Sequence, residues 1–167
     1  HKITRNIQPL SLGMALWGIV IFLLVPLSRG SEFVNFESPQ VHPLDLSADG
    51  QTLAACNTAA NAVEIFNVSA SGEIQLRTTI ATGIDPVTAR FRTNTELWVV
   101  NHVSDSVSII DLNDGVITKT LGTRDEPCDV VFAGVPEKAF VSCSAVNTIE
   151  VYDLVDLDAL PRAVVIE

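Results

Sequence analysis

The residues best suited to bind a cation each stand directly before a proline. They are His42, Asp85 and Glu126. Carboxylate oxygens are preferred ligands of Ca²⁺ and Mg²⁺, and imidazole nitrogens suit transition metals. Short polar residues before proline are also common in turns, so a purely structural role is the alternative. The choice between them depends on how the fold arranges the three side chains.

The chain lacks the short motifs that mark common catalytic centres. It has no Cys-x-x-Cys-His haem attachment, no Gly-x-Ser-x-Gly elbow, no His-Glu-x-x-His zinc motif and no glycine-rich phosphate loop. The sequence therefore predicts no catalytic residue and no cofactor within these 167 residues. It leaves open which cofactors a longer protein would carry.

A repeat of just over forty residues supplies the elements that would position these side chains. One aligned column contains Asn57, Asn101 and Cys143, at intervals of 44 and 42 residues, and the prolines at 43, 86 and 127 recur with nearly the same period. A period in the low forties filled with short β-type segments is typical of propeller blades, each a four-stranded antiparallel sheet.

Each repeat divides into four segments rich in β-branched residues and separated by Asn, Asp, Gly and Ser. The expected strands are 44–47, 52–56, 62–67 and 76–81 in the first repeat, 87–92, 96–100, 106–111 and 116–121 in the second, and 128–132, 138–143, 148–152 and 162–166 in the third. We predict an all-β fold with blades over about 42–83, 84–124 and 125–167. Propellers have typically 4 to 8 blades, so three form an incomplete ring and we expect further blades downstream.

Three stretches carry a family likeness. They are Trp98-Val99-Val100-Asn101 with the following 104–111, then Gly83-Ile84-Asp85-Pro86 before a blade, and Ser47-Ala48-Asp49-Gly50 at a hairpin. Together they resemble the YVTN family of β-propeller repeats, although no repeat spells that motif literally and Ala48 replaces the usual proline. The likeness covers the chain from about residue 40. It implies an exported, usually seven-bladed propeller, commonly without an assigned activity.

The propeller would gather the candidate cation ligands on one face. Successive turns of an up-and-down sheet alternate between its two ends, so the loop before the first strand and the loop between the second and third strands lie together. Because first strands line the central channel, the set around its mouth is His42, Asp85, Glu126, His102 and Asp105. We expect a cation or small-ligand site there, with the metal unknown. The alternative is that Asp105, like Asn61 and Asn147 in its column, only forms a hairpin tip at positive φ.

Two further sets of side chains are expected to hold the structure together. Arg90 lies in an innermost strand, where a buried guanidinium needs a partner, and Asp45 or Asp129 would form an inter-blade ion pair with it. Cys128 begins the first strand of the third blade and Cys143 ends the second, so a four-residue turn would place them opposite each other as a disulfide candidate.

The N-terminus indicates export. Lys2 and Arg5 precede an uncharged apolar run, and small residues follow it, so residues 1–30 are expected to be a signal peptide or, alternatively, an uncleaved membrane anchor. Residues 31–41 would be a linker, or a strand over 32–37 that latches the ring by completing the last blade. The sequence predicts a periplasmic or extracellular protein, attached to a membrane only if the N-terminal segment is kept.

The composition narrows the classes of partner. A formal net charge of −10 disfavours nucleic acid as a partner. We therefore expect a binding or scaffold module for an unidentified small molecule or protein. The alternative is the propeller part of a larger oxidoreductase or lactonase-like enzyme whose active-site residues lie downstream.

Overall fold

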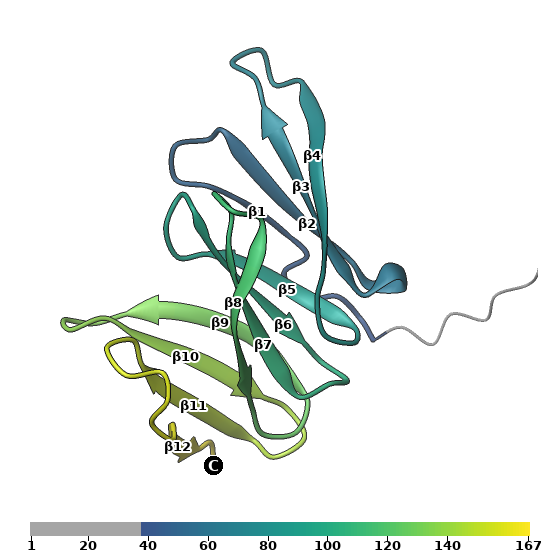
Figure 1. Ribbon diagram of the computed structural model, residues 1–167. Coiled ribbons are helices and arrows are strands. Elements are labelled where there is room, and N and C mark those ends of the chain that lie inside the picture. Colours follow the sequence, from purple (N-terminus) through teal and green to yellow (C-terminus); the bar gives the residue numbers. More distant parts are fainter. Residues whose placement is uncertain (1–37) are drawn as a thin grey trace, which may run out of the picture. The chain divides into compact units, whose positions relative to one another are not determined.

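The computed structural model describes residues 38–167, which form an all-β unit without an α-helix (Figure 1). Twelve strands in this range pair into three four-stranded antiparallel sheets. The predicted all-β fold of three consecutive blades is confirmed. The signal peptide or anchor expected over 1–30 and the latching strand expected over 32–37 lie outside the described residues.

The strands follow the repeat. Blade 1 consists of β1 (Leu44–Leu46), β2 (Thr52–Asn57), β3 (Ala62–Val68) and β4 (Ile74–Ala81), with the short 3₁₀ turn η1 (Thr58–Ala60) after β2. Blade 2 consists of β5 (Pro86–Phe91), β6 (Glu96–Asn101), β7 (Ser106–Asp111) and β8 (Val116–Gly122). Blade 3 consists of β9 (Pro127–Ala133), β10 (Lys138–Cys143), β11 (Thr148–Asp153) and β12 (Arg162–Val165).

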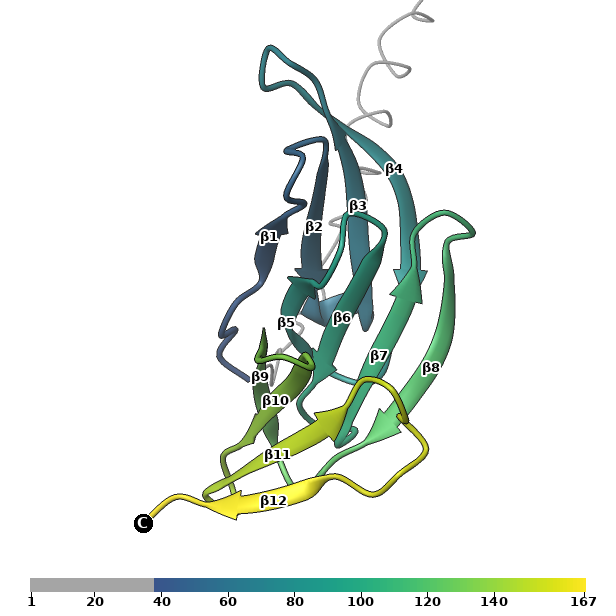
Figure 2. The ribbon, with the colours of Figure 1, turned by 90° about the vertical axis from the view of Figure 1, so that its left-hand side faces the viewer.

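Each blade is a simple meander in which sequential strands are neighbours. Figure 2 shows the innermost strands β1, β5 and β9 following one another on one side, with the outer strands β4 and β8 on the other. Side chains that point inward from β1, β5 and β9 therefore come from three separate blades yet lie near one another.

Two apolar layers join the blades, and blade 2 contributes to both. Successive residues of a strand point to opposite faces, so Leu97 and Val99 pack toward blade 1 while Trp98 and Val100 pack toward blade 3. All four side chains have no exposed surface. This is why the β6 sequence is apolar without alternation, as expected for a sheet enclosed on both faces.

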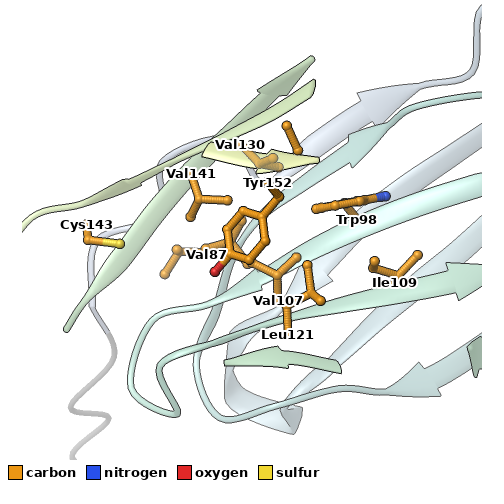
Figure 3. Packing of buried hydrophobic residues seen from close by; sticks show 11 residues of the cluster. Val87, Trp98, Val107, Ile109, Leu121, Val130, Val141, Cys143 and Tyr152 are labelled. Atoms are coloured by element: carbon orange, nitrogen blue, oxygen red, sulfur yellow. The ribbon is translucent and has the colours of Figure 1, made fainter. Parts of the chain in front are cut away.

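The layer between blades 2 and 3 contains the largest side chains. The ring of Trp98 meets that of Phe132 edge to face, with centroids 5.2 Å apart and planes at 81°. Figure 3 shows Tyr152 of β11 lying over Val107 and Leu121 of blade 2. Full burial of such side chains contributes about 1.5–3 kcal/mol each, so this layer is a main source of stability.

Within residues 38–167, no helix has the length and apolar character needed to cross a membrane.

Candidate functional site

Two of the three candidate residues that precede a proline adopt an unusual backbone conformation. Asp85 has φ 63° and Glu126 has φ 55°, both in the left-handed region that non-glycine residues rarely occupy. Asp85 is only 5% exposed, and its Oδ2 accepts a hydrogen bond from the Ser38 amide at 3.3 Å. The Glu126 Oε2 accepts one from the Ser144 hydroxyl at 3.3 Å. Both carboxylates therefore already bind neighbouring parts of the chain.

The amides of these residues join consecutive blades. The Asp85 N–H donates to Oδ1 of Asn61 at 2.9 Å, and the Glu126 N–H donates to Oδ1 of Asp105 at 2.9 Å. Asn61 and Asp105 occupy the tips between the second and third strands, at φ 52° and 46°. In each of these two hydrogen bonds, the amide before the next blade donates to a side chain at a hairpin tip. We call these two bonds the tip-to-linker contacts. They give these polar residues a structural role.

The hairpin tips also use their backbone carbonyls in all three blades. The carbonyl oxygens of Asn61, Asp105 and Asn147 accept from the amides of Thr82, Thr123 and Ile166, at 2.9, 2.9 and 2.8 Å. Asn147 has φ 47°, so the third tip has the same conformation as the other two. The column of Asn, Asp and Asn seen in the sequence thus marks a repeated joint between the hairpin tip and the end of the outer strand.

His102 is held by the same part of the fold. Its Nδ1 lies 3.0 Å from the carbonyl oxygen of Pro127, and because a carbonyl only accepts, this nitrogen carries the ring proton. The Cys128 Sγ lies 3.9 Å from the same nitrogen. With Nδ1 donating to Pro127, His102 does not present that nitrogen as a base to the thiol, so the pair is not a catalytic dyad in this arrangement.

The five residues expected around the channel mouth are not gathered as one metal site. Within residues 38–167, no group of three or more His, Cys, Asp and Glu side chains could hold a metal ion. Asp85, Glu126 and Asp105 take part in the tip-to-linker contacts, whereas His42 lies against Arg90. A small-ligand site at the mouth remains a prediction.

A different charged cluster lies on the innermost strands. Arg90 of β5 binds Asp129 of β9 through Nε–Oδ1 at 3.2 Å and Nη2–Oδ2 at 3.0 Å. Its Nη1 lies 3.0 Å from Nε2 of His42, which in turn is 3.8 Å from Oδ1 of Asp45. We call Asp45, His42, Arg90 and Asp129 the inner-strand ladder. It links all three blades, and its side chains are 25–33% exposed.

The backbone explains why His42 joins this ladder. His42 forms a parallel bridge with Thr88, the residue two before Arg90, so Thr88 and Arg90 project to the same face of β5. The arginine can only donate, so Nε2 of His42 is the acceptor in this contact. Asp45 does not pair with Arg90 directly. Its Oδ2 accepts from the Phe91 amide at 2.8 Å, a second bond between blades 1 and 2.

The expected pairing of Cys128 with Cys143 is wrong in its register. Strands β9 and β10 do pair from Ala133↔Lys138 to Asp129↔Ser142, as a four-residue turn requires, but a β-bulge then places Pro127 opposite Cys143. Proline has no N–H for the ladder, and the Asp129 amide donates instead to the Ser142 hydroxyl at 3.1 Å, so regular pairing stops at this point.

All three cysteines are free thiols in this structure. Burial raises the pKa of Cys56 to about 12, and burial together with the nearby Glu150 carboxylate raises the pKa of Cys143 to about 11. Near neutral pH both remain protonated, so neither is an activated nucleophile.

Glu150 is a buried acid that sequence reasoning missed. It is 5% exposed and its Oε2 accepts from the Arg124 amide at 3.1 Å and lies 2.9 Å from the Tyr152 hydroxyl. Burial, followed by the charge of Glu150, raises the pKa of Tyr152. The Arg124 Nε adds an ion pair at 3.5 Å. The only sequence signal for Glu150 was an acid within an apolar strand. Its contacts with Arg124 attach the linker before β9 to blade 3.

The fold and these joints define the class of a β-propeller-like protein, represented here by three blades. No family model matches the chain, and no curated protein matches it. The family named from the sequence, with its YVTN repeats, therefore remains a prediction.

Solved structures similar to this chain are propeller-like proteins. Hydrazine synthase of Kuenenia stuttgartiensis matches with a TM-score of 0.59 and 24% identity over 70% of this chain and 34% of that one. A putative 6-phosphogluconolactonase from Bacteroides uniformis matches with a TM-score of 0.60 and 21% identity over 78% of this chain and 46% of that one. Virginiamycin B lyase from Staphylococcus aureus matches with a TM-score of 0.57 and 13% identity over 74% of this chain and 40% of that one. This chain spans less than half the length of each, and at these identities the likeness supports the fold alone.

Proposed function

We propose that this chain is the binding part of an exported β-propeller and that its inner-strand ladder contacts the ligand. The observation that carries the proposal is the partial exposure of the ladder, whose four charged or titratable side chains come from three blades. A purely structural ion pair gains little from remaining open to solvent, because an exposed pair contributes only about 0–1 kcal/mol.

The donors and acceptors of the ladder suggest the chemistry of the ligand. Arginine has five N–H groups, and three of those of Arg90 have partners within residues 38–167. The remaining N–H groups can donate, while Asp45 and Asp129 can accept. A small molecule with both kinds of group, such as a polyhydroxylated compound, fits this mixture better than a simple anion, which the two aspartates repel.

Binding can be tested through the imidazole of His42. We would record its NMR signals while adding gluconate, glycine or trehalose as probes for an acidic polyol, a zwitterion and a neutral polyol. We expect a polyol to shift these signals in the wild type and not in Arg90→Met. Arg92→Met is the matched control, because Arg92 lies two residues along and pairs with Glu96 and Glu137 outside the ladder. Binding that survives Arg90→Met unchanged would contradict the proposal.

The second candidate is that these blades belong to a larger enzyme. The names of two similar structures, a putative 6-phosphogluconolactonase and virginiamycin B lyase, favour it. In that case the catalytic residues lie in sequence outside these 167 residues. We expect the chain alone not to hydrolyse 6-phosphogluconolactone. Turnover by the chain that Arg90→Met abolishes would replace the binding function with a catalytic one.

A further inference from the structure

The imidazole of His42 lies close to a cation and to an anion of the inner-strand ladder. Its Nε2 is 3.0 Å from Nη1 of Arg90 on β5 and 3.8 Å from Oδ1 of Asp45 on β1. Among residues 38–167, these are the two charged groups paired with the ring, and Asp129 of β9 acts on it through its two bonds to Arg90. The ring therefore has two available partners of opposite charge.

The protonation state of the ring decides which partner it prefers. A guanidinium only donates, so Nε2 can accept from Arg90 only while the imidazole is neutral. A protonated ring has an N–H on both nitrogens and would meet Arg90 as a like charge without a hydrogen bond. The Asp45 carboxylate attracts the protonated ring, and its Oδ1 is the oxygen that does not bind the Phe91 amide. Protonation thus reverses the preference.

The backbone of His42 does not have to move in this exchange. Its N–H donates to the Val87 carbonyl at 3.1 Å, and its own carbonyl accepts from the Ala89 amide at 3.0 Å, so the residue is fixed on β5. The imidazole is 33% exposed and can take a proton from water. The exchange requires only a rotation of this side chain, and the Asp45 bond to Phe91 and the pair of Arg90 with Asp129 are kept.

Protonation also changes what the ladder can bind. With a neutral imidazole the ladder contains two carboxylates and one guanidinium, so its net charge is −1. A protonated ring brings this net charge to zero, and its departure frees Nη1 of Arg90 to donate a charge-assisted hydrogen bond to a ligand. We infer that protonation of His42 transfers the ring from Arg90 to Asp45 and makes the ladder select ligands that carry a carboxylate. This selection rests on the ligand-binding function proposed above.

The affinity for a carboxylate should rise as the pH falls, because the protonated ring belongs to the state that binds it more tightly. Histidine side chains change charge between about pH 8 and about pH 5. One unit of charge at about 6 Å changes the affinity of a carboxylate about threefold even in a medium as polar as water. We expect gluconate to bind about threefold or more tightly at about pH 5.5 than at about pH 7.5. Sorbitol, which has an alcohol in place of that carboxylate, should change less.

The experiment measures the affinity of both probes at both pH values, by NMR titration of the full chain in mild detergent at low salt. His42→Gln keeps an oxygen that can accept from Arg90 but takes up no proton, so its affinity for gluconate should be the same at both pH values. Asp114→Asn is the control. It changes the net charge by one unit in an exposed turn outside the ladder and should keep the wild-type pH dependence. Circular dichroism verifies that each variant is folded.

A measurement without ligand tests the exchange of partners separately. The guanidinium NMR signals of Arg90, assigned by their loss in Arg90→Met, should change between the two pH values in the wild type and in Asp114→Asn. They should not change in His42→Gln. Signals that are the same at both pH values in the wild type would exclude the exchange.

The other outcomes separate this inference from the proposed function. A rise in gluconate affinity with acid that persists in His42→Gln would assign the pH response to another group. An equal pH dependence for gluconate and sorbitol would show that the ladder does not select the carboxylate. Failure of both probes to bind at either pH would refute the proposed function and the selection with it, whereas Arg90 signals that follow pH only when His42 is present would still establish the exchange.

Discussion

Replacing Gly83 by alanine tests the joint between blades 1 and 2. A Cβ at this position would lie 2.4 Å from Oγ of Ser104 and 2.7 Å from both Cγ and Nδ2 of Asn101. Asn101 cannot easily move, because it is fully buried and its Nδ2 donates to the hydroxyls of Ser106 and Ser108 at 3.2 and 3.0 Å. The added methyl group must therefore displace a side chain that is fixed by two bonds.

The size of the effect follows from these contacts. Overpacking costs about 1–3 kcal/mol, and weakening the Asn101 bonds adds about 1 kcal/mol each, partly relieved by relaxation. We expect Gly83→Ala to lower the free energy of unfolding by about 2–4 kcal/mol, which for a unit of this size lowers the Tm by roughly 10 °C.

Gly122→Ala is the control for this prediction. A Cβ there meets nothing within 4 Å, so the substitution should be neutral or stabilise by up to about 1 kcal/mol. Urea unfolding followed by circular dichroism measures both variants. Gly83→Ala/Ser104→Ala should recover part of the loss, because it removes the Oγ at 2.4 Å. Two single variants of equal stability, within about 0.5 kcal/mol, would refute the argument.

Three other predictions concern the backbone, the thiols and an exposed ion pair. Glu126→Gly should be more stable than Glu126→Ala by about 1 kcal/mol, since φ is 55° there, and equal urea midpoints would contradict this. Iodoacetamide at pH 8 should modify Cys128 before Cys143, because the Cys143 thiol has a pKa of about 11 and is only 2% exposed. Peptide mass mapping measures the order of modification, and the reverse order would be incompatible with this packing. The hydrogen bond from Lys138, then that from a backbone amide, lowers the pKa of Asp153 below 3.8, so its stabilisation is present above about pH 4 and is lost as the pH falls through the folded value. In Asp153→Asn the urea midpoint should therefore fall less as the pH drops below about 4 than it does in the wild type. An unchanged dependence of the midpoint on pH would rule out this contribution of Asp153.

The sequence was sufficient to predict the blades because their signal is repeated. The strands 106–111 and 138–143 were expected at the residues where they occur, and the other ends differ by at most two residues. The constant spacing between equivalent residues of the three repeats limits where each strand can lie. An ambiguous segment such as Ile74–Ala81 is therefore located from the fourth strands of the other two repeats. The apolar run in β6 lies in a sheet covered on both faces, where Leu97 packs toward blade 1 and Trp98 toward blade 3.

The sites could not be predicted as well, because they depend on single bonds between blades. The bulge beside Cys143 shifts one residue of one strand, and sequence spacing alone does not reveal such a shift. His42 was expected at the channel mouth because it precedes a proline, and its bridge to Thr88 and contact with Arg90 are features that the spacing alone did not reveal. Asp85 has a positive φ, which agrees with the alternative that it forms a turn. No residue type is found only at positive φ, so the sequence could not decide between a turn and a ligand site.

The tip-to-linker contacts bear on how such a chain can change by gene duplication. In both contacts the donor is a backbone amide, which every residue except proline possesses. The two linkers differ, with Gly83 and Asp85 in one and Arg124 and Glu126 in the other, yet the bond is 2.9 Å in each. For this bond only the tip must keep an Asn or Asp. A copied blade inserted by unequal crossing over can therefore form the same bond with a linker of different sequence, within the limits set by the crowding at Gly83 and by the positive φ of Asp85 and Glu126.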